Sequence, residues 1–194
     1  MPRTQQERTE TTISALVGAA RESFAQDGYA ATSLDAVVAS AGVTKGALYH
    51  HFEGKRELFG AVFEREQQRL VAEIAAVALR KSDPWDAFEA GCRAFLELSL
   101  DSGVQRIMLL DAPGALGWDT VRTLESGSLA LMQAGLERVM DAGYIERRPV
   151  APLAHLLFGA MCEAAMVAAR AENPRVAERA MFGELRRLLQ AMRA

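Results

Sequence analysis

Apolar side chains recur with the period of an α-helix along most of the chain. Near the N-terminus, Ile13, Leu16, Val17, Ala20 and Phe24 stand at i, i+3, i+4, i+7 and i+11, which places them on one face of a helix. Between turn signals, no segment alternates apolar and polar residues as a half-buried strand does. Alanine and leucine, which favour helix, far outnumber the β-branched valine and isoleucine. The pattern predicts an all-α protein.

Capping residues, glycines and prolines divide this pattern into separate helices. Asp83-Pro84 and Asn173-Pro174 each combine a capping side chain with a proline at the first helical position. Residues 111–117 hold two glycines and a proline, so a turn-rich break is expected there. About nine helices are predicted, at about 7–26, 34–41, 45–52, 55–81, 84–100, 104–110, 119–142, 150–171 and 174–192.

The length of 194 residues fits one large domain or a small domain joined to a larger one. Residues 55–81 contain no proline and a single glycine, so one long helix is expected to connect two parts. We therefore predict an N-terminal domain at 1–54, a linking helix at 55–81 and a C-terminal domain at 82–194.

Composition limits the class of protein and its location. Apolar residues make up 50 % of the chain, which supplies a core and excludes intrinsic disorder. Charges interrupt every apolar stretch before about 20 residues, and the N-terminus lacks a secretion signal, so no membrane span or export is expected. The two cysteines, Cys92 and Cys162, are too few for a disulfide framework or a zinc cluster. We expect a cytoplasmic protein without a metal or cofactor.

The net charge of −3 at first argues against a nucleic-acid partner, because DNA-binding domains are usually basic. Divided by region, residues 1–56 carry six acidic and six basic groups, and residues 82–194 account for the whole −3. The acidity therefore belongs to the C-terminal part and does not exclude DNA binding by the N-terminal part.

Residues 33–52 have the spacing of a helix-turn-helix, and the second helix concentrates cationic and hydrogen-bonding side chains. Two of the three lysines, Lys45 and Lys55, and two of the three histidines, His50 and His51, lie in this helix or directly after it. A helix of this length fits the major groove of DNA, where its N-terminal residues reach base edges. The spacing alone is equally consistent with ordinary packing of a helical hairpin.

A longer stretch, 28–58, has the sequence pattern of a known family. It includes the turn at Gly42, the sequence LYHHF at 48–52 and the following Lys55. This stretch resembles the DNA-binding domain of TetR-type (TetR/AcrR) transcriptional regulators. The resemblance implies a homodimer on double-stranded operator DNA, in which each subunit has an N-terminal helix-turn-helix domain and a larger helical domain for ligand binding and dimerisation. The chain departs from many relatives by having Asp-Ala at 35–36, where a basic residue is often found.

The resemblance also implies which residues contact DNA. Lys45, Gly46 and Ala47 would lie near the bases, and most of the others would lie on phosphates. The full predicted set is Thr32, Ser33, Thr44, Lys45, Gly46, Ala47, Tyr49, His50, His51 and Lys55.

A small-molecule effector is expected in the C-terminal domain, among large apolar side chains and a few polar ones. Aromatic and methionine residues at helical spacing belong to the core more often than to a ligand site. The absence of a charged cluster indicates a mostly apolar, neutral effector. The candidates are Phe88, Cys92, Phe95, Leu109, Trp118, Met132, His155, Met161, Glu163 and Met166.

The last two predicted helices, at about 150–192, are expected to form the dimer interface. Each has an apolar face, and packing of both helices against their symmetry mates would make a four-helix interface. The predicted faces are Leu153, Leu156, Leu157, Ala160, Met161 and Ala164, then Phe182, Leu185, Leu188, Leu189 and Met192.

The sequence thus predicts a ligand-responsive DNA-binding regulator, with repression favoured over activation. An enzyme is not expected, because no catalytic triad, glycine-rich phosphate loop, HExxH or CxxC motif is present. Two alternatives remain open: a helical dimeric binding module without DNA activity, and a thiol-based redox sensor that uses Cys92 and Cys162.

Overall fold

The computed structural model describes residues 5–193, and every regular element in that range is a helix. The prediction of an all-α fold is confirmed. The first four residues of the predicted domain 1–54, and Ala194 at the end of the domain 82–194, lie outside the described residues. In order, the elements are α1 (Gln5–Ala31), α2 (Leu34–Ala41), α3 (Lys45–His51), α4 (Lys55–Ala78), α5 (Pro84–Leu98), α6 (Ser102–Val104), η1 (Gln105–Asp111), α7 (Ala112–Leu116), α8 (Trp118–Leu124), α9 (Ser126–Asp141), α10 (Val150–Arg170) and α11 (Pro174–Ala191).

Side-chain caps place several helix starts where the sequence predicts them. Thr44 caps α3 by accepting a hydrogen bond of 3.2 Å from the backbone amide of Ala47. Asp83 and Asn173 cap α5 and α11 in the same way, each followed by a proline in the first turn. These caps satisfy amides that a helix N-terminus leaves without intrahelical partners.

The region between α5 and α9 differs from the prediction. The expected single helix at 119–142 is broken at Glu125 into α8 and α9, because Ser126 and Gly127 follow with low helix propensity. The expected break at 111–117 contains the short helix α7, whose first turn includes Pro113, a position that a proline tolerates. The preceding segment, η1, is a π-helix, a form often found at functional sites.

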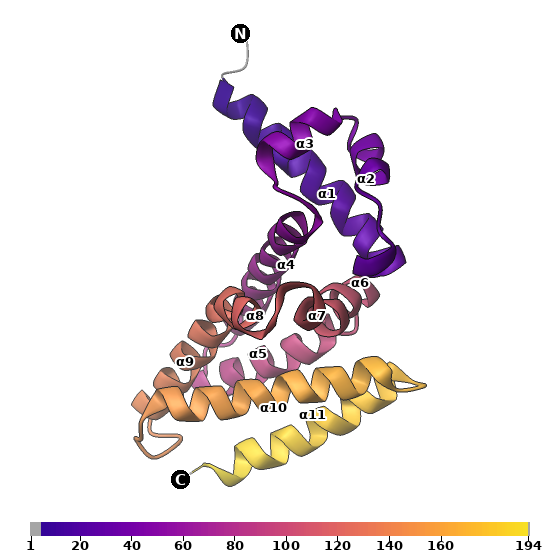
Figure 1. Cartoon of the computed structure of the whole chain (residues 1–194). Coiled ribbons are helices and arrows are strands. Elements are labelled where there is room, and N and C mark those ends of the chain that lie inside the picture. The colour runs from indigo at the N-terminus through magenta and orange to yellow at the C-terminus, as the bar shows by residue number, and fades with distance from the viewer. Residues whose placement is uncertain (1–4, 194) are drawn as a thin grey trace.

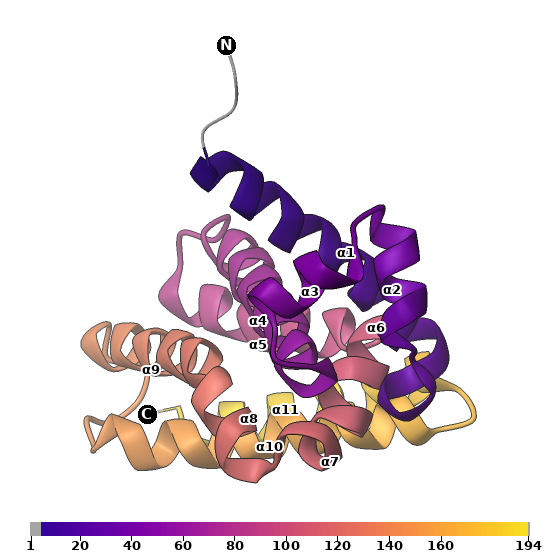
Figure 2. The same ribbon diagram turned by 45° about the horizontal axis from the view of Figure 1, so that its top comes forward.

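Helices α1 to α3 form a head at one end of the molecule, and α4 runs from that head into the larger domain (Figure 1). At the far end α10 and α11 lie side by side. In the second view α1 again lies on the opposite side of the molecule from α10 (Figure 2). Two hydrophobic cores follow this arrangement. One joins the head to α4 and to the α6–α8 region, and the other joins α5, α9, α10 and α11.

One described helix, α10, is long and apolar enough in composition to cross a membrane. The sequence expectation did not foresee this, because Glu163 interrupts the apolar run. In the fold α10 packs against α9, α11 and α5, and its Ala154, Phe158 and Ala165 belong to the second core. Because 33 % of its apolar window is buried inside the subunit, this packing accounts for part of the apolar composition of α10.

The faces predicted for dimerisation are only partly free. Leu156, Ala160 and Leu188 are exposed, as a subunit interface requires. The other residues of the predicted faces are buried or half-buried within the subunit. The predicted faces are therefore wider than the exposed strip that intramolecular packing leaves at Leu156, Ala160 and Leu188. Buried in the subunit are Leu157, Met161, Ala164, Phe182, Leu185 and Leu189, while Leu153 and Met192 are half-buried.

Candidate nucleic-acid interface and effector cavity

Helix α3 has one buried face and one open face. Leu48 is fully buried and Phe52, directly after the helix, is nearly so, and both belong to the first core. On the opposite side Lys45 and Gly46 are exposed, and the Tyr49 side chain is 52 % exposed. The helix therefore presents its N-terminal turn and a phenol ring to solvent.

Lys45 forms an ion pair across the turn of the motif. Its Nζ lies 2.7 Å from Oδ1 of Asp35 on α2, and both side chains are exposed. The hydrogen bond and charge of Asp35 raise the pKa of Lys45, so the ammonium is fully charged at neutral pH. Asp35 therefore holds Lys45, one of the residues predicted to lie near the bases, in an exposed ion pair.

Two of the predicted phosphate-binding side chains have partners inside the protein. The Thr32 side chain is buried, and its Oγ1 donates a hydrogen bond of 2.8 Å to the carbonyl of Gly28. Lys55 Nζ donates to the carbonyls of Ala30 and Thr32, each at 3.0 Å, and lies 4.9 Å from the ring centre of Tyr29. The sequence places Lys55 at the unfavourable positive end of α4, and its ammonium instead reaches the negative, carbonyl end of α1.

The remaining predicted DNA contacts lie around the open face. Ser33 is exposed at the N-cap position of α2, and its side chain makes no capping hydrogen bond there. His50 is exposed and His51 half-buried, with ring centres 4.8 Å apart in an edge-to-face arrangement. Within residues 5–193, no group of three or more His, Cys, Asp or Glu is placed to hold a metal ion.

The end of α1 docks on the π-helical segment of the larger domain. The backbone amide of Tyr29 donates a 2.7 Å hydrogen bond to Oδ2 of Asp111, which also lies 3.4 Å from Nε of Arg106. Gly28 kinks α1 with φ 78° and ψ 169°, and a Cβ at this position would lie 2.5 Å from the Arg106 guanidinium. The backbone conformation therefore requires a glycine, whereas the Arg106 guanidinium, the end of a flexible side chain, could move away from an added Cβ.

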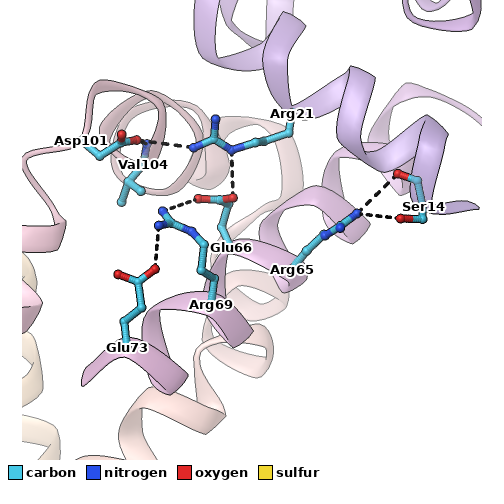
Figure 3. Close-up of polar contacts among 8 residues, drawn as sticks. All are labelled: Ser14, Arg21, Arg65, Glu66, Arg69, Glu73, Asp101 and Val104. Atoms are coloured by element: carbon cyan, nitrogen blue, oxygen red, sulfur yellow. Dashed lines mark hydrogen bonds and ion pairs between the residues drawn. The ribbon is translucent and has the colours of Figure 1, made fainter. Parts of the chain in front are cut away.

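A second junction joins α1 to α4 and α6 through a buried carboxylate (Figure 3). Glu66 is 5 % exposed in its side chain and accepts hydrogen bonds of 3.0 Å from both Arg21 and Arg69. Arg21 also lies 3.6 Å from Asp101, whose carboxylate caps the backbone amide of Val104 at 2.9 Å. A buried carboxylate with two cationic partners is stable only while they stay in place, so this junction fixes the head relative to α4.

The C-terminal domain contains an apolar cavity of about 110 Å³ between α4, α5, α9 and α10. Five of the predicted effector residues line it: Phe88, Cys92, Phe95, Met132 and Met161. The other five do not line it: Leu109, Trp118, His155, Glu163 and Met166. Trp118, His155 and Glu163 are exposed instead, and Trp118 stacks on the Arg122 guanidinium at 4.2 Å.

The sequence reasoning missed the contribution of α4 to the cavity. Ile74 and Ala78 come from this helix. Ser128 of α9 also lines the cavity, and its hydroxyl lies 3.2 Å from Oε1 of the buried Gln67 of α4. The large apolar residues of α4 were the available signal, but periodicity alone does not distinguish a cavity wall from a core.

Both thiols are unsuited to redox sensing. Burial raises the pKa of Cys92 to about 12, with a smaller effect from Glu89 in the same direction. Burial, with a smaller contribution from Glu125, raises the pKa of Cys162 to about 12 as well. Because the thiolate is the reactive form, neither group has the lowered pKa of a sensor cysteine.

A helix-turn-helix head with an open second helix, joined by one long helix to a larger helical domain, defines a DNA-binding regulator. Two family models match the chain. Residues 16–62 match "Bacterial regulatory proteins, tetR family", and residues 85–192, more than half of the chain, match "Tetracyclin repressor-like, C-terminal domain". The chain belongs to the TetR family of bacterial transcription regulators.

Individual relatives agree with this assignment. A solved structure of a TetR-family transcriptional regulator from Pectobacterium atrosepticum shares 33 % identity, with a TM-score of 0.86 over 99 % of this chain and 98 % of that one. The transposon Tn10 TetC protein of Escherichia coli is 33 % identical over 62 % of this chain and 60 % of its own length. The activator FasR of Mycolicibacterium smegmatis is 35 % identical over 42 % of this chain and 37 % of its own. This chain therefore matches less than two thirds of the length of TetC and of FasR.

Proposed function

We propose that this protein is a ligand-responsive transcriptional repressor that binds a two-fold symmetric operator as a homodimer. Residues 1–54 form the DNA-binding domain, 55–81 the linking helix and 82–194 the effector and dimerisation domain. A small, mostly apolar effector in the cavity releases the DNA. TetR-family regulators bind operator DNA and act as dimers, which supports the assignment. The proposal assigns no catalytic step to the chain.

The observation that carries the proposal is the course of α4. This helix begins at Lys55, directly after the predicted recognition helix α3, and reaches the cavity with Ile74. These residues are 19 positions apart, about 28 Å along a helix. One rigid element therefore runs from the predicted DNA contact Lys55 to the cavity, and an effector that displaces Ile74 also moves the end of α4 on which α1 of the head packs.

The recognition surface follows from the open face of α3. Gly46 leaves space for a close backbone approach, because even an added Cβ would have only Thr44 Oγ1 nearby, at 3.9 Å. Lys45 and Tyr49 flank that space, and we assign them to base and phosphate contacts. Lys55 and Thr32 support the surface from inside by fixing the end of α1.

The test begins with selection of DNA from a random pool by the full-length protein. We expect an inverted repeat with half-sites about one helical turn apart, or a multiple of it. Binding of the selected duplex is then measured by fluorescence anisotropy for Lys45→Ala and Tyr49→Ala, with Lys81→Ala as control. Lys81 is the third lysine of the chain and is exposed beyond the end of α4. Failure of any sequence to be enriched, or full affinity in the α3 variants, would refute DNA recognition by this surface.

The direction of regulation needs its own measurement, since FasR is named an activator. Expression of a reporter gene placed downstream of the selected site distinguishes repression from activation. We expect lower expression with the protein than without it, because a dimer on a promoter blocks polymerase. Higher expression would replace repression by activation and leave operator binding intact.

A further inference from the structure

The cavity has a single charged residue in its lining, and that residue is Arg138 of α9. The rest of the lining is apolar except for Ser128. Cys92 and Phe158 lie at buried positions, whereas Arg138 and Ala134, one turn apart on α9, are exposed. The cavity therefore runs from an apolar interior to a guanidinium group at the surface.

Arg138 has no carboxylate partner among residues 5–193, although Glu137 and Asp141 are close to it in the sequence. Asp141, three residues later on the same helix, forms an ion pair with Arg147 instead. Asp83, next to the cavity residue Pro84, accepts hydrogen bonds from the Tyr144 hydroxyl and the Asp86 amide. The carboxylates of Asp141 and Asp83 thus bind groups other than Arg138.

Several arginines of the same domain form ion pairs. Arg93, Arg122 and Arg186 each hold a glutamate at 3.0 Å or less. Arg138, Arg170, Arg175 and Arg179 form none among residues 5–193, and of these four Arg138 alone lines the cavity. A guanidinium offers a planar fork of donors that matches a carboxylate in a bidentate geometry. At the edge of an apolar cavity such a pair is less screened by water than on an open surface.

We propose that the effector is an amphipathic monocarboxylic acid whose apolar body fills the cavity and whose carboxylate binds Arg138. This inference rests on the proposed function and names the chemical class of its ligand. The volume of about 110 Å³ is slightly below the roughly 150 Å³ of a cavity that holds benzene. The apolar body is therefore a single ring or a short alkyl chain. The structure thus revises the neutral effector expected from the sequence, because no charged cluster is needed when one arginine is left unpaired.

The experiment uses matched pairs of compounds on the full-length protein. Benzoic, 4-ethylbenzoic, phenylacetic, hexanoic and octanoic acids are each compared with the corresponding neutral amide, by titration calorimetry and by release of the selected operator. We expect at least one acid to bind about tenfold or more tightly than its amide, as charge-assisted hydrogen bonds contribute about 1.5–3 kcal/mol. Arg138→Gln should abolish this preference, and Arg138→Lys should restore part of it.

Arg170→Gln is the matched control. Like Arg138, Arg170 is an exposed arginine in the last turn of a helix, where a cation interacts favourably with the helix dipole, but it does not line the cavity. Circular dichroism and thermal melting show whether each variant is folded. The acid preference should be unchanged in Arg170→Gln.

The failures of the two proposals are distinguishable. If amides bind and release DNA as well as the acids, or Arg138→Gln keeps the acid preference, the carboxylate inference is wrong while the effector cavity stands. If none of the acids binds, the inference is also wrong. If acids bind the cavity but never alter operator affinity, the ligand class holds and the ligand-responsive part of the proposed function fails.

Discussion

The carboxylate of Asp111 accepts a hydrogen bond of 2.7 Å from the backbone amide of Tyr29, 82 residues earlier in the chain. The bond joins the last turn of α1, in the head, to the end of the π-helical segment η1, in the larger domain. Arg106 of η1 approaches the same carboxylate at 3.4 Å. The end of α1 is therefore attached directly to the larger domain, in addition to its packing on α4.

Substitution of Asp111 by alanine should destabilise the protein. The change leaves the part-buried Tyr29 amide without its acceptor, which costs about 1–3 kcal/mol in the free energy of unfolding. Urea denaturation followed by circular dichroism measures the loss. Asp111→Asn keeps an acceptor oxygen and should lose less, and equal stability of the alanine variant and the wild type would contradict the structural role of this bond.

Substitution of Gly28 by alanine should be harmful for two separable reasons. The φ of 78° and ψ of 169° lie in a region open almost only to glycine, at a cost of about 1–3 kcal/mol for other residues. The new Cβ would also displace the Arg106 guanidinium, which is the end of a flexible side chain, so this second cost should be the smaller one. The stability of Gly28→Ala is compared with that of the double variant Gly28→Ala/Arg106→Ala, each against its own background. A smaller loss in the Arg106→Ala background gives the cost of the collision, and an equal loss would show that only the backbone conformation matters.

The Lys45–Asp35 ion pair should limit DNA binding. Lys45→Ala removes one cation from the predicted interface, so affinity should fall, and the salt dependence should weaken by at most about 0.9 in slope, the value for one neutralised phosphate. Asp35→Asn frees the same lysine and removes a negative charge beside the DNA, so its affinity should rise. Anisotropy titrations over a range of salt concentrations test both. An unchanged affinity in Asp35→Asn would mean that the ion pair has no influence on DNA binding.

The helix-turn-helix and most helix boundaries could be predicted from the sequence because their causes are local. Thr44, Asp83 and Asn173 cap the helices that begin beside them, and the stripe from Leu16 to Phe24 is buried in the first core. These features depend on residues three or four positions apart, which periodicity and capping rules describe.

The site details that the sequence did not predict depend on contacts between distant residues. Lys55 supports α1 because folding brings Ala30 and Thr32 to it, 25 and 23 residues away. Arg138 reaches the same cavity as Ile74 and Cys92 because α9 packs against α4 and α5. The sequence pattern shows which residue types are present, but it does not show which residues come into contact after folding. The roles of Lys55 and Arg138 could therefore be assigned only from the structure.

The two cysteines should be almost inert in the folded protein. With pKa values raised to about 12, the thiolate fraction at pH 8 is about a thousandfold below that of an ordinary thiol. Labelling with iodoacetamide followed by mass spectrometry should therefore show little reaction at Cys92 or Cys162 until urea unfolds the chain. Rapid labelling of either residue in the native protein would contradict this prediction and support the redox-sensor alternative.

The strip of α10 and α11 that the subunit leaves uncovered should mediate dimerisation. Leu156 and Leu188 are 73 % and 61 % exposed, and a leucine in such a position gains most by burial against a partner. Leu156→Glu places a charge in the proposed interface and should yield a monomer at micromolar concentration in sedimentation equilibrium. Its operator affinity should fall together with the dimer, because a monomer reaches only one half-site. Leu79→Glu is the control, since Leu79 is equally exposed at 73 % but lies at the end of α4. A dimer that survives Leu156→Glu and Leu188→Glu together would place the interface elsewhere, and dissociation caused by Leu79→Glu would point to the end of α4.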